Sequence, residues 1–184
     1  MRRLLILVGI LAALGAFVYF YEFRGKEERE KKEEASKKFI QLDADNASRV
    51  SLVRPKENPI VFVKNGTQWK MTQPIQTNAD STSVDGLLQS LASATSDRTI
   101  EKADLAKYGL KDPSVTVTVE EGTKKQTIRL GEKDFSGSNV YAARENEGNV
   151  YLIPDSAYIK ATQSVTDFRD KSIFEFNTEG VDRI

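Results

Sequence analysis

The chain of 184 residues contains no cysteine and no histidine. The absence of cysteine excludes disulfide bonds, thiolate ligands for zinc or an iron–sulfur cluster, and a cysteine nucleophile. The absence of histidine removes the commonest general base and the commonest transition-metal ligand. Any chemistry would therefore depend on carboxylates, hydroxyls or amines.

The chain also lacks an excess of charge of either sign. It has 27 basic and 27 acidic residues, so its formal net charge is zero. Proteins that bind nucleic acids carry a basic excess gathered into a patch or a stripe. The charge balance predicts no nucleic-acid partner, and the length suits one domain of ~100–200 residues.

One long hydrophobic run lies near the N-terminus. Residues 4–21 read LLILVGILAALGAFVYFY and carry no charge over 18 positions. A helix rises about 1.5 Å per residue, so this run just spans a hydrocarbon core of about 30 Å. A cleaved signal peptide would have a shorter apolar stretch, whereas residues 17–21 stay apolar and aromatic, which suits a membrane–water interface. We expect an uncleaved transmembrane anchor, with a removed signal peptide as the alternative.

The charges on the two sides of this run predict its orientation. Arg2 and Arg3 precede it, so the positive-inside rule places residues 1–3 in the cytoplasm and the rest of the chain outside it. Residues 22–38 are highly charged and contain acid–base pairs four positions apart, such as Glu27/Lys31, in the order that stabilises a helix. They predict a solvated stalk, and the absence of an apolar seam argues against a coiled coil.

Residues 39–173 have the pattern of a mixed domain. Short segments that are apolar, or that alternate apolar with polar residues, lie between turn residues and predict strands. These segments are 49–54, 60–63, 67–72, 114–120, 124–130, 139–144 and 149–153. The turns between them are expected at Asn65-Gly66, Glu121-Gly122 and Glu147-Gly148.

Helices are indicated at three places in the same region. Asp80 or Ser81 can cap a helix whose apolar residues follow the i, i+3, i+4, i+7 spacing, namely Val84, Leu87, Leu88 and Leu91. A short helical turn at 103–107 ends at Gly109, and a last helix runs from 155 to about 165. The sequence therefore predicts an α+β domain of antiparallel β meanders with a few short helices. Trp69 and the tyrosines Tyr141, Tyr151 and Tyr158 are expected to pack in its core rather than to line a binding face.

The end of the chain resembles the start of the domain. Residues 40–50 read IQLDADNASRV and residues 174–184 read FEFNTEGVDRI, with apolar residues at the first and third places and Arg plus a β-branched aliphatic at the end. The second segment is interpreted as the start of a second copy of the module. On that interpretation the chain is a fragment or the product of a truncated gene.

Few residues suggest chemistry. Asp80 and Asp85 are one carboxylate pair, but a helix-capping aspartate and an exposed helical aspartate explain them better. Ser136-Gly137-Ser138 lacks the strand–turn–helix context of a nucleophile and the lysine of a phosphate loop, so we interpret it as a plain loop. No segment has the alternating oxygen ligands of a calcium loop. We assign no catalytic, cofactor-binding or metal-binding residue and expect no cofactor.

Several short motifs follow the hydrophobic run in a defined order. They are Trp69-Lys70-Met71-Thr72-Gln73-Pro74, Ala79-Asp80 before Leu87-Leu88, Tyr108-Gly109-Leu110 with Pro113, Leu130-Gly131, Val140-Tyr141, and Phe168-Arg169-Asp170 before Ile173. Through them the chain resembles, from Leu42 to Ile184, the N-terminal portion of the bacterial family called domain of unknown function 4340 (DUF4340). The resemblance implies a single-pass protein of the inner (cytoplasmic) membrane with an extracytoplasmic domain, often encoded beside ABC-transporter components of the gliding-motility auxiliary type. It implies no catalytic residue.

The leading hypothesis is a non-enzymatic, membrane-anchored binding or scaffold module, an accessory component of an ABC-type envelope transport system. Its partners would be the membrane and the permease or ATPase subunits of the transporter. One alternative is an envelope enzyme that acts on glycan or peptide through carboxylates such as Asp80, Asp85 or Asp134. Another is a structural spacer, whose globular domain could be exchanged for an unrelated one.

Overall fold

The computed structural model describes residues 14, 15, 17, 19, 37–96 and 98–172. Contacts divide the chain into two compact units, Met1–Lys38 and Phe39–Ile184. Most of the expected anchor at 4–21, nearly all of the stalk at 22–38 and the repeat at 174–184 lie outside the described residues. Within the part that is described, no helix is long and apolar enough to cross a membrane.

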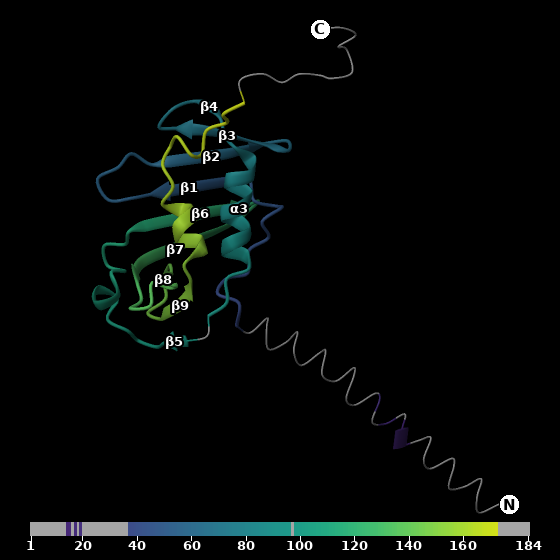
Figure 1. Cartoon of the computed structure of the whole chain (residues 1–184), viewed down its shortest axis with the longest axis vertical. Helices are drawn as coiled ribbons and strands as arrows, with labels where there is room; N and C mark the ends of the chain where they lie inside the picture. The colour runs from purple at the N-terminus through teal and green to yellow at the C-terminus, as the bar shows by residue number, and fades with distance from the viewer. Residues whose placement is uncertain (1–13, 16, 18, 20–36, 97, 173–184) are drawn as a thin grey trace, which may run out of the picture. The chain divides into compact units, whose positions relative to one another are not determined.

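The second unit is built on one antiparallel sheet, in which nine strands of the described residues take part (Figure 1). The strands are β1 (Arg49–Val53), β2 (Ile60–Asn65), β3 (Gln68–Gln73), β4 (Thr77–Asn78), β5 (Arg98–Ile100), β6 (Val115–Glu121), β7 (Lys124–Lys133), β8 (Asn139–Arg144) and β9 (Val150–Pro154). Their order across the sheet is β4-β3-β2-β1-β6-β7-β8-β9-β5. Two meanders, β1–β4 and β6–β9, thus meet where β1 pairs with β6, which confirms the predicted antiparallel meanders.

Two of the three expected turns lie one residue later than the sequence suggested, and the third, expected at Glu147-Gly148, lies earlier, at residues 145–146. Asn65 pairs with Gln68 across β2 and β3, so the loop is Gly66-Thr67, and Gly66 has a φ of +64°. The β6–β7 turn is built in the same way, with Gly122 at a φ of +57°. Two-residue loops with a positive φ at the first position match the twist of the flanking strands. Glycine suits that position because it has no Cβ to clash at positive φ.

Helix α3 (Ser81–Ala92) follows the prediction closely. Asp80 caps it by accepting a 3.0 Å hydrogen bond from the Thr82 backbone N–H. The four residues of the predicted stripe are all buried in the core: Val84, Leu87, Leu88 and Leu91. Gly86 lies where this helix packs against α4 (Ser156–Ala161), since a Cβ there would come within 2.9 Å of the Lys160 ammonium.

Helix α4 is shorter than predicted, because it ends at Ala161 rather than near residue 165. Arg54, which follows β1, donates hydrogen bonds of 3.0 Å from Nη1 to the carbonyl oxygens of Thr162 and Gln163. A cation near the carboxyl end of a helix interacts favourably with the helix dipole. Its N–H groups also satisfy carbonyl oxygens that have no partner within the helix. Ser164 then begins a new turn, in which the Asp167 carboxylate accepts from the Ser164 N–H.

We predict that Arg54→Ala lowers the free energy of unfolding by about 2 kcal/mol, because its side chain is only 10% exposed and serves two carbonyls. Equilibrium urea unfolding of the full chain in detergent measures this change. The matched control is Glu57→Ala, which removes the 3.1 Å ion pair to Arg54 from a carboxylate that is 55% exposed. That variant should lose less than about 0.5 kcal/mol. Equal losses in the two variants would show that the helix end does not depend on Arg54.

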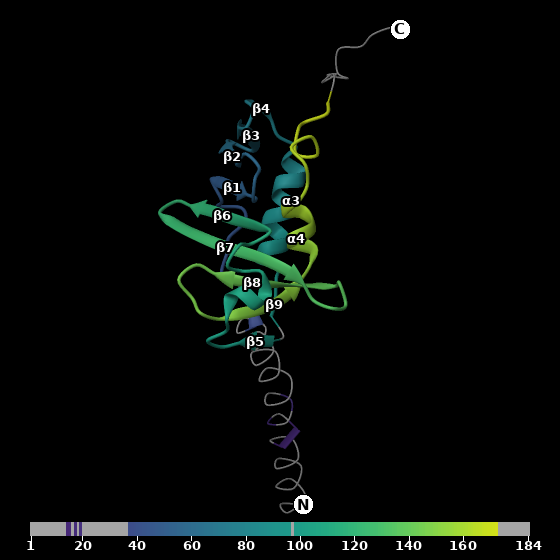
Figure 2. The same cartoon turned by 90° about the vertical axis from the view of Figure 1, so that its left-hand side faces the viewer.

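The main core lies between the sheet and the two helices, which cover the same face (Figure 2). Alternate residues of the strands face the helices, so Val50, Leu52 and their neighbours Val117 and Val119 on β6 are fully buried. Trp69 is also fully buried, as predicted. The aromatic rings of Phe62 and Phe168 pack at 5.0 Å between centroids and join the last described segment to the core.

A second, smaller cluster lies on the other face, near β8 and β9. A 3-10 helix, η2 (Leu105–Tyr108), lies over it and ends at Gly109, whose φ is +67°. The buried members of the cluster are Leu110, Ala143 and Val150, and the rings of Tyr108 and Tyr141 approach to 4.7 Å. The predicted helical turn at 103–107 is therefore present, one to two residues later and in the tighter 3-10 form.

The two edge strands of the sheet, β4 and β5, were not expected from the sequence. Strands β4 and β5 contain only two and three residues, too few to show a period. After α4 the chain comes back to the β4 edge of the sheet. There Ala79 forms a β-bridge with Arg169, and the Asp170 N–H donates to the Asn78 carbonyl at 3.1 Å. This return satisfies backbone groups that a bare edge would leave exposed.

Candidate functional site

The aspartates Asp80 and Asp85 do not share a site. Asp80 and Asp170 line a polar hollow of about 230 Å³. The Asp80 carboxylate also accepts a 2.8 Å hydrogen bond from the Ser83 hydroxyl. Asp85 lines a separate, wider hollow of about 560 Å³ together with Lys64. Its Oδ1 accepts a 2.7 Å hydrogen bond from Nε1 of the buried Trp69. Both carboxylates are thus engaged in contacts that hold α3 in place.

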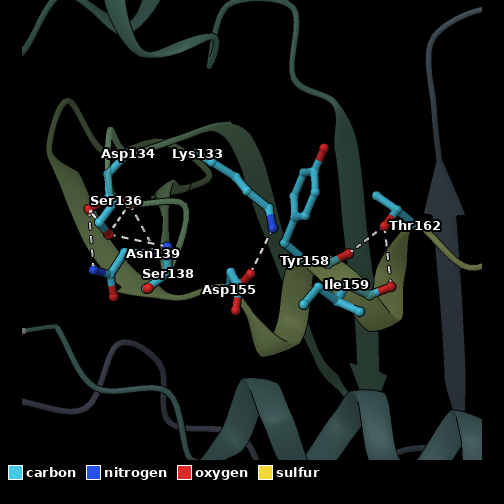
Figure 3. A network of polar contacts seen from close by, with 9 residues as sticks. All are labelled: Lys133, Asp134, Ser136, Ser138, Asn139, Asp155, Tyr158, Ile159 and Thr162. Atoms are coloured by element: carbon cyan, nitrogen blue, oxygen red, sulfur yellow. Dashed lines mark hydrogen bonds and ion pairs between the residues drawn. The ribbon is translucent and has the colours of Figure 1, made fainter.

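The third candidate, Asp134, organises the loop between β7 and β8 (Figure 3). Its carboxylate accepts from the Ser136 hydroxyl at 2.8 and 2.9 Å and from the Asn139 N–H at 3.2 Å. The loop is closed by a 2.9 Å hydrogen bond from the Asp134 N–H to the Asn139 carbonyl. Ser136-Gly137-Ser138 is therefore the plain loop that was predicted, and the Ser136 hydroxyl stabilises its turn by donating to Asp134.

The loop favours the charged form of Asp134. Desolvation acts to raise its pKa, but the hydrogen bonds from Ser136 and Asn139 outweigh it and lower the pKa below the ordinary value of 3.8. The pKa of Asp167 is lowered in the same way by hydrogen bonds from Ser164, and that of Asp170 by hydrogen bonds from Ser172. Each of these three loops is held by an ionised aspartate.

The lowered pKa values predict the direction of the pH dependence. A carboxyl whose folded pKa lies below its unfolded value stabilises the fold above that unfolded value, 3.8, and the contribution is lost as the pH falls through the folded pKa. Urea unfolding of the full chain from about pH 7 to about pH 2.5 should show a loss of stability below this value. The Asp134→Asn variant should show a smaller acid-induced loss than the wild type. Identical profiles would contradict the assigned role of the loop.

A second set of contacts ties this loop to the start of α4. Lys133 forms a 2.7 Å ion pair with Asp155, and its ammonium lies 5.5 Å from the centre of the Tyr158 ring. The Asp155 N–H donates to the Ser138 carbonyl at 3.0 Å. Figure 3 shows the Lys133–Asp155 ion pair that joins the end of β7 to the start of α4. We call residues 133–139 with residues 155–159 the hairpin–helix corner.

This corner presents two apolar side chains to solvent. Phe135, at the tip of the loop, is fully exposed, and Ile159 on α4 is 51% exposed. Neither residue belongs to a motif that was expected from the sequence. The one signal in the sequence is an aromatic residue within a run of turn-forming residues, Asp134-Phe135-Ser136-Gly137.

The three tyrosines that were considered for a binding face lie mainly against apolar neighbours. Tyr151 is buried, and its ring meets Phe39 edge-on at 5.3 Å between centroids. Tyr141 packs in the second cluster and Tyr158 packs partly against the main core. Among the residues that the structure describes, no three acidic side chains gather closely enough to hold a metal ion.

The fold defines a class: a single antiparallel sheet covered on one face by two helices, with an ordered hairpin at one end that exposes an aromatic side chain. The family model described as a domain of unknown function, DUF4340, matches residues 69–184, so the chain belongs to that family. The match begins at Trp69, later than the expected start at Leu42. No curated protein and no solved structure matches the chain.

The motifs that carry the family resemblance meet one another in the structure. The Ala79 N–H donates to the Trp69 carbonyl at 3.0 Å. A Cβ on Gly131 would lie 2.2 Å from the Tyr108 carbonyl oxygen, so Tyr108-Gly109 and Leu130-Gly131 are in direct backbone contact. These family motifs therefore maintain the fold.

Proposed function

We propose that the chain is a membrane-anchored, extracytoplasmic binding or scaffold module, and an accessory component of an ABC-type envelope transport system. It would be held in the inner membrane by residues 4–21, with residues 1–3 in the cytoplasm. Partner subunits would be the permease or the ATPase of the transporter.

The proposal of an anchor is supported by the first unit. Leu14, Phe17 and Tyr19 lie in helical conformation and are 58%, 66% and 64% exposed. A helix that is hydrophobic all round is typical of a membrane-spanning segment, so apolar side chains that face outward on this helix suit a lipid environment. The uncharged run and the preceding Arg2 and Arg3 support the same placement.

Binding rather than catalysis is supported chiefly by the hairpin–helix corner, which holds an exposed Phe135 on an ordered loop. Exposed aromatic side chains are typical anchors of protein interfaces. The carboxylates of the enzyme alternative have structural partners, and Asp80 and Asp85 line different hollows. Glycosidase chemistry, for example, needs two carboxyl groups about 5–9.5 Å apart around one substrate.

The experiment is a pull-down of the tagged full-length protein from its native membranes in mild detergent, with partners quantified by mass spectrometry. We expect a permease and an ATPase in amounts close to that of the bait. Recovery of the bait alone would overturn the proposal. An activity on glycan or peptide that one Asp→Asn variant abolishes without a change in folding would favour the enzyme instead.

A further inference from the structure

Phe135 is held in an exposed position by a loop that is already ordered. The Gly137 N–H donates to the Asp134 carbonyl at 3.0 Å, and the Ser138 N–H donates to the Ser136 hydroxyl at 3.2 Å. With the Asp134–Asn139 bonds, these contacts fix the backbone on both sides of the phenylalanine. A fixed loop loses little conformational entropy when its tip is bound, so more of the contact energy contributes to affinity.

The exposure of Phe135 points to binding rather than to folding. Because the side chain is fully exposed, it adds nothing to the stability of the fold through apolar burial, whereas its transfer from water into an apolar pocket would be strongly favourable. The neighbouring helix adds a second apolar group, because Ile159 lies in the first turn of α4 and is 51% exposed. The Lys133–Asp155 ion pair and the Asp155–Ser138 hydrogen bond keep that turn beside the loop.

The charges around Phe135 indicate which surface could receive it. Lys133 is paired with Asp155 at 2.7 Å, which leaves Asp134, the residue before Phe135, as a negative charge without a basic partner among the described residues. A carboxylate next to the aromatic residue would be repelled by the anionic lipid headgroups of a bilayer surface. The same carboxylate is complementary to lysine or arginine side chains at the rim of a protein pocket.

We propose that Phe135 is the anchor residue of a protein–protein interface, and that it inserts into an apolar pocket of the partner whose rim is basic. Ile159 contacts the edge of the same pocket, and Asp134 faces the basic rim. The inference rests on the proposed binding function and names the surface that carries it.

Two substitutions measure the contribution of the anchor. Phe135→Ala should lower the affinity of the chain for its partner by about 10- to 100-fold, the range expected when an aromatic anchor that is buried in an interface is truncated. Ile75→Ala is the matched control, because Ile75 is 41% exposed and lies between β3 and β4, in the other meander of the sheet. Neither variant should change the urea unfolding midpoint, since neither removes a buried side chain.

The direct test places a photoreactive benzophenone side chain at position 135 of the full-length chain in its native membranes, and in parallel at position 75. After irradiation the cross-linked peptides are identified by mass spectrometry. We expect an adduct from position 135 only, to one protein, on a peptide that combines apolar residues with lysine or arginine. The yield should fall several-fold in about 0.5 M salt, which screens the charged rim.

Several results would overturn the inference: adducts to lipid, adducts to a second copy of this chain, the same adducts from position 75, or no adduct. The outcome can be separated from that of the proposed function. If a permease and an ATPase are recovered equally with wild type and Phe135→Ala, the accessory role stands and the anchor assignment fails. If position 135 cross-links specifically to a protein outside any transporter, the anchor assignment stands and the transport role fails.

Discussion

Replacing Gly131 by alanine should destabilise the domain by about 3 kcal/mol, close to the upper end of what overpacking usually costs. The added Cβ would lie 2.2 Å from the Tyr108 carbonyl oxygen and 3.1 Å from the carbonyl of Gly109. Both neighbours are backbone atoms, so no side chain can rotate to relieve the clash. The η2 segment would have to move away from β7, which would open the second cluster around Leu110. Urea unfolding of the full chain measures the loss of stability, and amide hydrogen exchange locates it.

The control for this prediction is Gly148→Ala. A Cβ added at Gly148 would meet no atom within 4 Å, and the residue does not have a positive φ. Alanine there reduces the freedom of the unfolded chain, so the variant should be neutral or more stable by up to about 1 kcal/mol. Equal stability of Gly131→Ala and Gly148→Ala would show that the Tyr-Gly-Leu motif does not lie in close contact with β7.

Replacing Trp69 by alanine should cost about 4 kcal/mol, which places it with Gly131→Ala as the most damaging single changes we expect. The ring is fully buried between β3 and α3, and its removal leaves a large cavity. It also removes the 2.7 Å hydrogen bond to Asp85. The loss is measured by urea unfolding of the full chain.

The Asp85 partner separates the structural account from a catalytic one. Asp85→Ala leaves the buried indole N–H without an acceptor and should cost about 1–2 kcal/mol, whereas Asp85→Asn keeps an oxygen in place and should cost less than half of that. In the Trp69→Phe background the two substitutions should become nearly equal, because the donor is gone. If Asp85→Ala leaves stability unchanged in the wild type, the carboxylate is not a structural partner of Trp69.

The parts of the fold that were predictable are those with a clear period. The spacing of Val84, Leu87, Leu88 and Leu91 placed α3, and the alternating valines at 115, 117 and 119 placed β6. In each case the spacing of the apolar residues shows which face of the helix or strand packs against the core, and the structure buries that face. Asp80 was assigned as one of two candidate caps on propensity, and its hydrogen bond to the Thr82 N–H confirms it.

The parts that were not predictable depend on contacts between distant segments. α4 ends early because Arg54, more than one hundred positions away, takes the carbonyls of Thr162 and Gln163. β4 and β5 are held by their neighbours rather than by their own composition. A glycine inside a helix normally weakens it, but Gly86 leaves room for the Lys160 side chain of the packed helix α4.

The candidate site was less predictable than the fold. The sequence identified Asp134 as a carboxylate, but the ring of donors around it, Ser136 and Asn139, depends on loop closure. The same closure leaves Phe135 outside the core, and no periodic pattern marks such a residue. The exposed aromatic side chain became evident only when the burial of every residue in the loop was known.

We propose that the α+β domain itself carries the binding surface. A domain exchange tests this by replacing residues 39–173 with an unrelated domain of similar size, with residues 1–38 unchanged, and repeating the quantitative pull-down from native membranes. We expect the permease and the ATPase that are recovered with the wild-type chain to be lost from the exchanged chain. If both subunits are recovered in unchanged amounts, the domain is a spacer and does not carry the binding surface.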